Sequence, residues 1–137
     1  VARMADLWSA CGGDVRVLDP EVHDRIFAAV SHLPHVLAFA LVDLLAARPD
    51  ASEVFRYAAS GFRDFTRIAS SHPEMWRDIC LANREALLKE LSKFEGHLTG
   101  LRMALEAADG AAVETVFSRA RAARNRWIES AGRGPSV

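Results

Sequence analysis

Apolar residues recur every three or four positions after residue 20, which is the spacing of an α-helix. The clearest run is Val22, Ile26, Val30, Leu33, Leu37, Leu41 and Leu44. Asp19 can cap this helix, and Pro20 can occupy its first turn. Pro34 lies inside the run and removes a backbone donor, so the pattern predicts a long helix kinked near Ser31.

Further segments have the same helical spacing. Short helices are expected at about residues 51–60 and from Gly61 to the residue before Pro73. A long helix is expected from Pro73 to Asp109, and the later half of this helix has the spacing of a seam packed along a neighbouring helix. A final helix follows from Val113. The pattern therefore predicts a mainly α fold of about five to six helices.

The first 18 residues differ from the rest. An amphipathic helical pattern stops at a glycine pair, and residues 15–17 alternate as in a short strand. A lone strand cannot satisfy its own backbone groups, so it needs a sheet that this chain does not supply. We expect residues 1–18 to be the tail of an upstream α/β domain, and residues 19–137 to form the helical domain.

Composition and charge exclude several classes of protein. Hydrophobic residues make up 50% of the 137 residues, and the formal net charge is −1, which supports a core and gives no general attraction to nucleic acid. Cys11 and Cys80 have no metal-like spacing. The most apolar stretch, residues 36–47, is too short to span a bilayer, and the first residues lack a signal-peptide pattern. We expect a cytoplasmic protein that binds neither nucleic acid nor membrane.

The segment SHLPH, residues 31–35, places two histidines three positions apart within the apolar run. A zinc site, a pair of hydrogen-bonded core histidines, and a pocket for an anion or substrate are three interpretations. His32 and His35 lack the zincin spacing and its glutamate, so no metal site is expected. The core and pocket interpretations both stay open on the residues alone.

Two basic segments can each be interpreted either as a binding site or as a solvated helix face. Arg63 and Arg67, in GFRDFTR, are four positions apart and can form a guanidinium clamp for a carboxylate. A solvated face with a local Asp64–Arg67 pair is the alternative. The segment SRARAARNR lacks interleaved aromatic residues and is typical of a solvated helix. No GxGxxG, P-loop, GxSxG or HExxH motif occurs. The residues alone therefore indicate a helical, oligomeric domain, in which an anion pocket is one of the two open interpretations of the histidines.

Three stretches together resemble one family. They are HDRIFAAVSHLPHVLAFAL, GFRDFTRIASSHPEMWRDICLANREALL and LWSACGGDVRVLDPEVHD. In their order and content they resemble the C-terminal part of prephenate dehydrogenases and of the related arogenate and cyclohexadienyl dehydrogenases of tyrosine biosynthesis. The resemblance runs from about Leu7 to Leu91, and beyond Leu91 it rests on the helical pattern only.

The resemblance implies an enzyme of aromatic amino acid biosynthesis. An N-terminal Rossmann domain would bind NAD or NADP, and residues 1–18 would be the C-terminal remnant of this nucleotide-binding domain. A C-terminal helical domain would form a homodimer, and the active site would lie between the two domains. Such an enzyme oxidatively decarboxylates prephenate to 4-hydroxyphenylpyruvate and passes hydride to the nucleotide. The cofactor-binding glycines and the main catalytic histidine belong to the upstream part, so this chain alone is expected to be inactive. The alternatives are an arogenate-specific dehydrogenase and a helical interaction module without catalysis.

The resemblance also implies roles for individual residues. The residues implied to bind substrate are Ser31, His32, His35 and Arg67. Arg67 would hold a substrate carboxylate, and Asp24 would orient Arg67 through an ionic network. Positions near the site whose roles are undefined are Gly61, Asp64 and Trp76. The histidine pair is further implicated in feedback inhibition by tyrosine.

Overall fold

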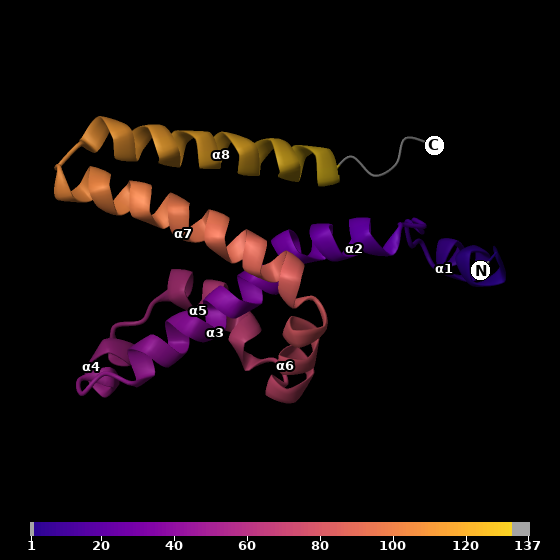
Figure 1. Cartoon of the computed structure of the whole chain (residues 1–137), viewed down its shortest axis with the longest axis horizontal. Helices are drawn as coiled ribbons and strands as arrows, with labels where there is room; N and C mark the ends of the chain where they lie inside the picture. Colours follow the sequence, from indigo (N-terminus) through magenta and orange to yellow (C-terminus); the bar gives the residue numbers. More distant parts are fainter. Residues whose placement is uncertain (1, 133–137) are drawn as a thin grey trace. The chain divides into compact units, whose positions relative to one another are not determined.

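The computed structural model describes residues 2–132, and all regular structure in that range is helical (Figure 1). The predicted mainly α class is therefore confirmed. The chain divides into two compact units, one ending at Leu91 and the other beginning at Ser92. Eight α-helices are present in the described range, and one of them lies in the first 18 residues. The other seven exceed the five to six expected, because a π-helical turn divides one predicted long helix into two labelled parts and Asn83 ends another.

The N-terminal segment departs from its prediction. Helix α1 spans Ala2–Ala10 and is followed by Gly12, which has a positive φ of 83° that glycine adopts without strain. Residues 13–19 have no regular secondary structure, so the strand predicted at residues 15–17 is not formed. The described range contains no other strand that could pair with this segment, and an unpaired strand leaves its backbone groups unsatisfied.

The first long helix is continuous but irregular. It consists of α2 (Pro20–Phe27), the π-helical turn η1 (Ala28–His32) and α3 (Leu33–Ala46). The carboxylate of Asp19 accepts the N–H of Glu21 at 2.9 Å, as a helix cap does. The N–H of Leu33 reaches back five residues to the carbonyl of Ala28. The irregularity expected from Pro34 is thus a wider, π-helical turn immediately before the proline.

Four shorter elements follow in the same unit. They are α4 (Ala51–Arg56), α5 (Ser60–Thr66), the 3-10 turn η2 (Arg67–Ser70) and α6 (Pro73–Ala82). Helix α3 packs against α4, α5 and η2. This packing brings segments far apart in the sequence next to the helix that carries the histidines.

The helix predicted from Pro73 to Asp109 is two helices. Helix α6 ends at Asn83, whose φ of −108° and ψ of 30° are not helical, and α7 (Arg84–Glu106) begins directly after it. A turn then leads to α8 (Gly110–Gly132), which lies beside α7 (Figure 1). The carboxylate of Asp109 accepts the N–H of Ala112 at 2.9 Å and so caps α8.

The buried part of the chain is small and partly polar. Among the residues described, the buried apolar side chains are Ala28, Ala38 and Leu87, and the buried polar ones are His32 and Asn83. Large apolar side chains such as Val30, Leu105 and Phe117 are 60–69% exposed. A core this small leaves most of the apolar surface of the chain uncovered.

The continuous helix Pro20–Ala46 has the length and apolar composition that a membrane span requires. It is longer than the apolar run considered from the sequence, because π-helical η1 joins α2 to α3 without a break. The core helix of a soluble protein has the same length and composition, so these two properties do not assign the helix to a membrane.

Candidate functional site

The π-helical turn places Ser31 and His32 next to His35 on the first turn of α3. The ring Nδ1 of His35 lies 2.9 Å from the carbonyl oxygen of Ser31. A carbonyl only accepts, so Nδ1 of His35 carries a proton and donates it. In the neutral imidazole, Nε2 of His35 is then an acceptor. This local contact fixes the tautomer of one of the two histidines.

Trp76 of α6 joins the two histidines. Its ring stacks on His35 with centroids 3.4 Å apart and planes 18° apart, and it meets His32 edge-on at 6.1 Å. The indole Nε1 is buried and has no hydrogen-bond partner within the described part of the chain. A buried donor without a partner is costly, so this N–H is available to an acceptor from outside these residues.

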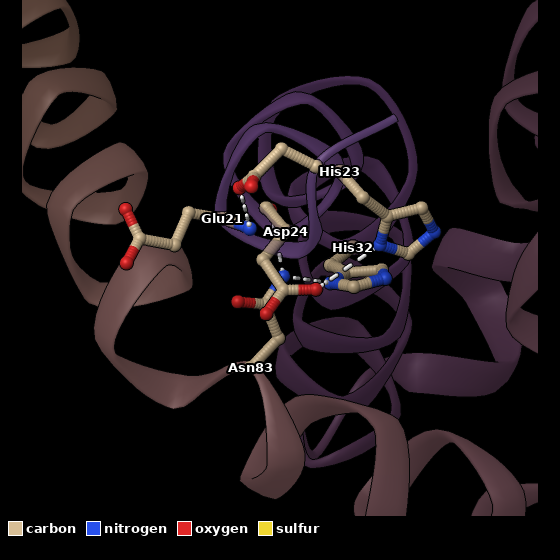
Figure 2. A network of polar contacts seen from close by, with 6 residues as sticks. Glu21, His23, Asp24, His32 and Asn83 are labelled. Carbon is tan, nitrogen blue, oxygen red and sulfur yellow. Dashed lines mark hydrogen bonds and ion pairs between the residues drawn. The ribbon is translucent and has the colours of Figure 1, made fainter. Parts of the chain in front are cut away.

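His32 is tied to a residue that the sequence analysis missed. The side-chain nitrogen of Asn83 lies 2.8 Å from the carbonyl oxygen of Asp24 and 3.2 Å from Nδ1 of His32 (Figure 2). Asn83 lies 51 residues after His32 and 59 after Asp24, so sequence spacing could not reveal the contact. The one available signal was an asparagine inside a predicted helix, where its helix propensity is low.

The environment of His32 favours its neutral form. Burial lowers the pKa of His32 below its ordinary value, and the nearby His23 and His35 act in the same direction. The carboxylate of Asp24 opposes them, but burial is the largest effect. A neutral imidazole here is a hydrogen-bonding group with one donor and one acceptor nitrogen.

The side chains of the remaining predicted residues are not joined to this cluster by a hydrogen bond within residues 2–132. The carboxylate of Asp24 contacts Nδ1 of His23 at 3.0 Å, and both side chains are about half exposed. Arg67 begins η2, which packs on α3, and its side chain is exposed. Within residues 2–132, no ion pair joins Arg67 to Asp24 or to Asp64, so the ionic network remains a prediction. Gly61 and Asp64 are exposed on α5.

The structure therefore brings together Ser31, His32, His35 and Trp76 and adds Asn83 to them. Asp24 joins the cluster only through its backbone carbonyl, and Arg67, Gly61 and Asp64 lie outside it. No three histidine, cysteine, aspartate or glutamate side chains in the described range are grouped so that they could hold a metal ion. What the cluster offers chemically is a set of oriented hydrogen-bonding groups beside an indole ring.

A helical domain with a buried imidazole–amide cluster is the class of protein that the fold and the site define. Residues 19–119 match the family described as prephenate dehydrogenase, dimerization domain. The matched range covers most of the chain, and the chain belongs to this family. The whole cluster lies within the matched range.

Three relatives illustrate the similarity. The cyclohexadienyl dehydrogenase of Zymomonas mobilis is 38% identical over 126 residues, which cover 90% of this chain and 43% of that protein. The prephenate dehydrogenase of Aquifex aeolicus, solved in complex with hydroxyphenyl propionate and NAD⁺, is 38% identical with a TM-score of 0.82, over 91% of this chain and 44% of that one. The arogenate dehydrogenase of Synechocystis is 26% identical with a TM-score of 0.81, over 92% and 46%. This chain thus spans less than half the length of each relative.

Proposed function

We propose that this chain is the dimerisation and substrate-binding domain of a dehydrogenase that oxidatively decarboxylates prephenate to 4-hydroxyphenylpyruvate. The observation that carries the proposal is that the whole buried cluster falls inside the segment matched by the family. Because the chain spans less than half of its relatives, the activity belongs to a longer protein. The chain alone, residues 1–137, is proposed to lack it.

The geometry is suited to a dianionic, partly apolar substrate. Prephenate carries two carboxylates, and a pocket for it needs oriented donors within an apolar lining. The candidate donors are the imidazole of His32, the indole N–H of Trp76 and the guanidinium of Arg67. Ser31 lies in the π-helical turn, and His35, on the first turn of α3, contacts its carbonyl oxygen. In this proposal Arg67 holds one substrate carboxylate and Asp24 orients Arg67 when the substrate is bound, while Gly61 and Asp64 border the site.

The nucleotide is proposed to bind outside this chain. The sequence has no glycine-rich dinucleotide motif, whereas the Aquifex relative was solved with NAD⁺. NAD or NADP would accept the hydride, and residues 1–18 would be the C-terminal remnant of the domain that holds it. The family match begins at residue 19, which supports this boundary.

A homodimer is proposed as the assembly that covers the exposed apolar surface. The hairpin of α7 and α8 has a groove of about 580 Å³, lined in part by Leu105, Val113 and Phe117. A second copy of the chain is the occupant that the family's description as a dimerization domain supports. Burial by a second copy would also explain how a cytoplasmic protein can contain the long apolar helix Pro20–Ala46.

The decisive test is a steady-state assay of the longer protein that carries this domain. Prephenate and arogenate are each offered with NAD⁺ and with NADP⁺, and reduced nucleotide is followed by absorbance. We expect turnover of prephenate with at least one nucleotide and none by the 137-residue chain alone. Turnover of arogenate only would favour the second candidate, which the likeness to the Synechocystis enzyme supports. Failure with both substrates would refute the proposal, and added tyrosine would test for feedback inhibition.

A further inference from the structure

Asn83 connects three elements of the first unit through one side chain. It ends α6, and its amide nitrogen donates to the backbone of α2 at Asp24 and reaches His32 in η1 (Figure 2). The residue is 9% exposed, which makes it one of the most buried polar residues described. An amide nitrogen has two hydrogens and can serve both partners at once.

The identity of the partners determines the direction of each hydrogen bond. The backbone carbonyl of Asp24 can only accept, so the amide group that faces it must be the NH₂ group. The second hydrogen of this NH₂ group then points to Nδ1 of His32, which must offer a lone pair. An imidazole with a lone pair on Nδ1 is neutral and carries its proton on Nε2.

We propose that Asn83 is a positioning residue that locks His32 in the neutral Nε2–H tautomer, so that the imidazole presents one fixed N–H donor to the substrate. The lock follows from the contacts within this chain, whereas its use by a substrate rests on the proposed function. Protonation of Nδ1 would set two N–H groups against each other 3.2 Å apart, which disfavours the imidazolium. The acceptor that suits this donor is an oxygen atom of an anionic substrate.

Other charged and titratable groups near His32 do not reverse this assignment. Asp24 favours the imidazolium, but its carboxylate is engaged with His23. His23 and His35 both disfavour a further positive charge. The two histidines of the SHLPH segment therefore have opposite tautomers, because His35 donates from Nδ1 to Ser31 whereas His32 accepts there.

The first measurement needs only the wild-type 137-residue chain. Histidine labelled with ¹⁵N, observed by two-dimensional NMR through the carbon-bound ring protons, reports which ring nitrogen carries the proton. We expect His32 to show a protonated Nε2 and an unprotonated Nδ1 at neutral pH. A protonated Nδ1 on His32, or rapid averaging between the two tautomers, would overturn the proposal.

The second measurement replaces the amide group of Asn83 that contacts His32. Asn83→Asp replaces the donor by a carboxylate, which accepts from Nδ1 and stabilises the imidazolium, so the midpoint of the His32 titration should rise by about 1–3 pH units. Asn125→Asp makes the same chemical change at an exposed position of α8 and should leave the midpoint in place. A folded Asn83→Asp chain with an unchanged His32 midpoint would refute the lock. If this variant does not fold, the tautomer of His32 measured by NMR in the wild-type chain decides whether the proposal holds.

The enzyme assay separates the fixed tautomer of His32 from the proposed role of this imidazole in binding substrate. With the lock confirmed by NMR, Asn83→Asp in the longer protein should raise the KM for prephenate more than that for the nucleotide. A confirmed lock with unchanged KM for prephenate would overturn the assignment to substrate. Absence of any prephenate turnover by the wild-type protein would instead refute the proposed function and leave the tautomer result intact.

Discussion

Replacing Arg67 by alanine should separate the proposed substrate binding from folding. The side chain is exposed at the start of η2 and forms no ion pair within residues 2–132. Exposed substitutions that break no contact usually change stability by less than about 0.5 kcal/mol. Arg67→Ala should therefore melt at nearly the wild-type temperature, and any loss of activity will not reflect unfolding.

The effect on binding should be much larger than the effect on stability. A guanidinium can form two parallel hydrogen bonds with a carboxylate, and losing one member of a buried charge pair costs roughly 2–5 kcal/mol. Because Arg67 lies at the surface of this domain, we expect the lower end of that range, about 2 kcal/mol, or roughly thirty-fold in affinity. Arg67→Lys should restore only part of this, since an ammonium keeps the charge but not the planar fork.

The assay is steady-state kinetics of the longer protein, run beside a thermal melt. The KM for prephenate should rise by about the expected factor, provided that KM tracks binding, while the KM for the nucleotide changes little. Arg56→Ala, at an exposed arginine that ends α4, is the matched control and should leave both constants unchanged. An Arg67→Ala enzyme with wild-type KM for prephenate would refute the assignment of Arg67 to a substrate carboxylate.

Three further predictions concern the turn, the buried histidine and the assembly. Pro34→Ala restores a backbone donor and allows η1 to become α-helical, so the KM for prephenate should rise without a loss of melting temperature. The lowered pKa of His32 means that its contribution to stability is complete above about pH 6.5 and is lost as the pH falls below that value; melting temperatures from pH 8 to 5 should fall more steeply for wild type than for His32→Gln. The 137-residue chain should scatter light as a dimer at micromolar concentration, whereas Leu105→Asp, in the groove of the α7–α8 hairpin, should be a monomer that remains helical by circular dichroism.

Local rules predicted the first long helix well. The cap at Asp19 and the irregularity before Pro34 both follow from which backbone groups need a partner, and both are present. The prediction of a strand at residues 15–17 was wrong, because alternation of side chains does not supply a neighbouring strand. The break at Asn83 was missed for a related reason: its side chain satisfies groups more than fifty residues away.

The candidate site shows the same division between local and distant information. The SHLPH segment could be recognised from the sequence because a proline and two histidines are unusual in an apolar helix. The contact of His35 with Ser31 spans only four residues and is local. Stacking of Trp76 on His35 depends on how α6 packs beside α3, which no periodicity encodes. The predicted pairing of Asp24 with Arg67 depends on a bound ligand as well as on packing, since it requires a substrate carboxylate at Arg67. It therefore remains a prediction.

The placement of the polar cluster in this helix has a physical reason. The residues that follow Pro34 are almost entirely apolar, and an ordinary helix there would offer an anionic substrate no oriented donor. A proline removes one backbone donor, and the π-helical turn before it shifts the following side chains relative to those before it. Such a turn is less favourable than a regular helix, so it needs contacts that hold it. Asn83 holds it from α6, and His35 holds it from within by donating to Ser31. The contacts that stabilise the turn are thus the ones that fix the two imidazoles, and a change that relaxes the helix should also release the donor.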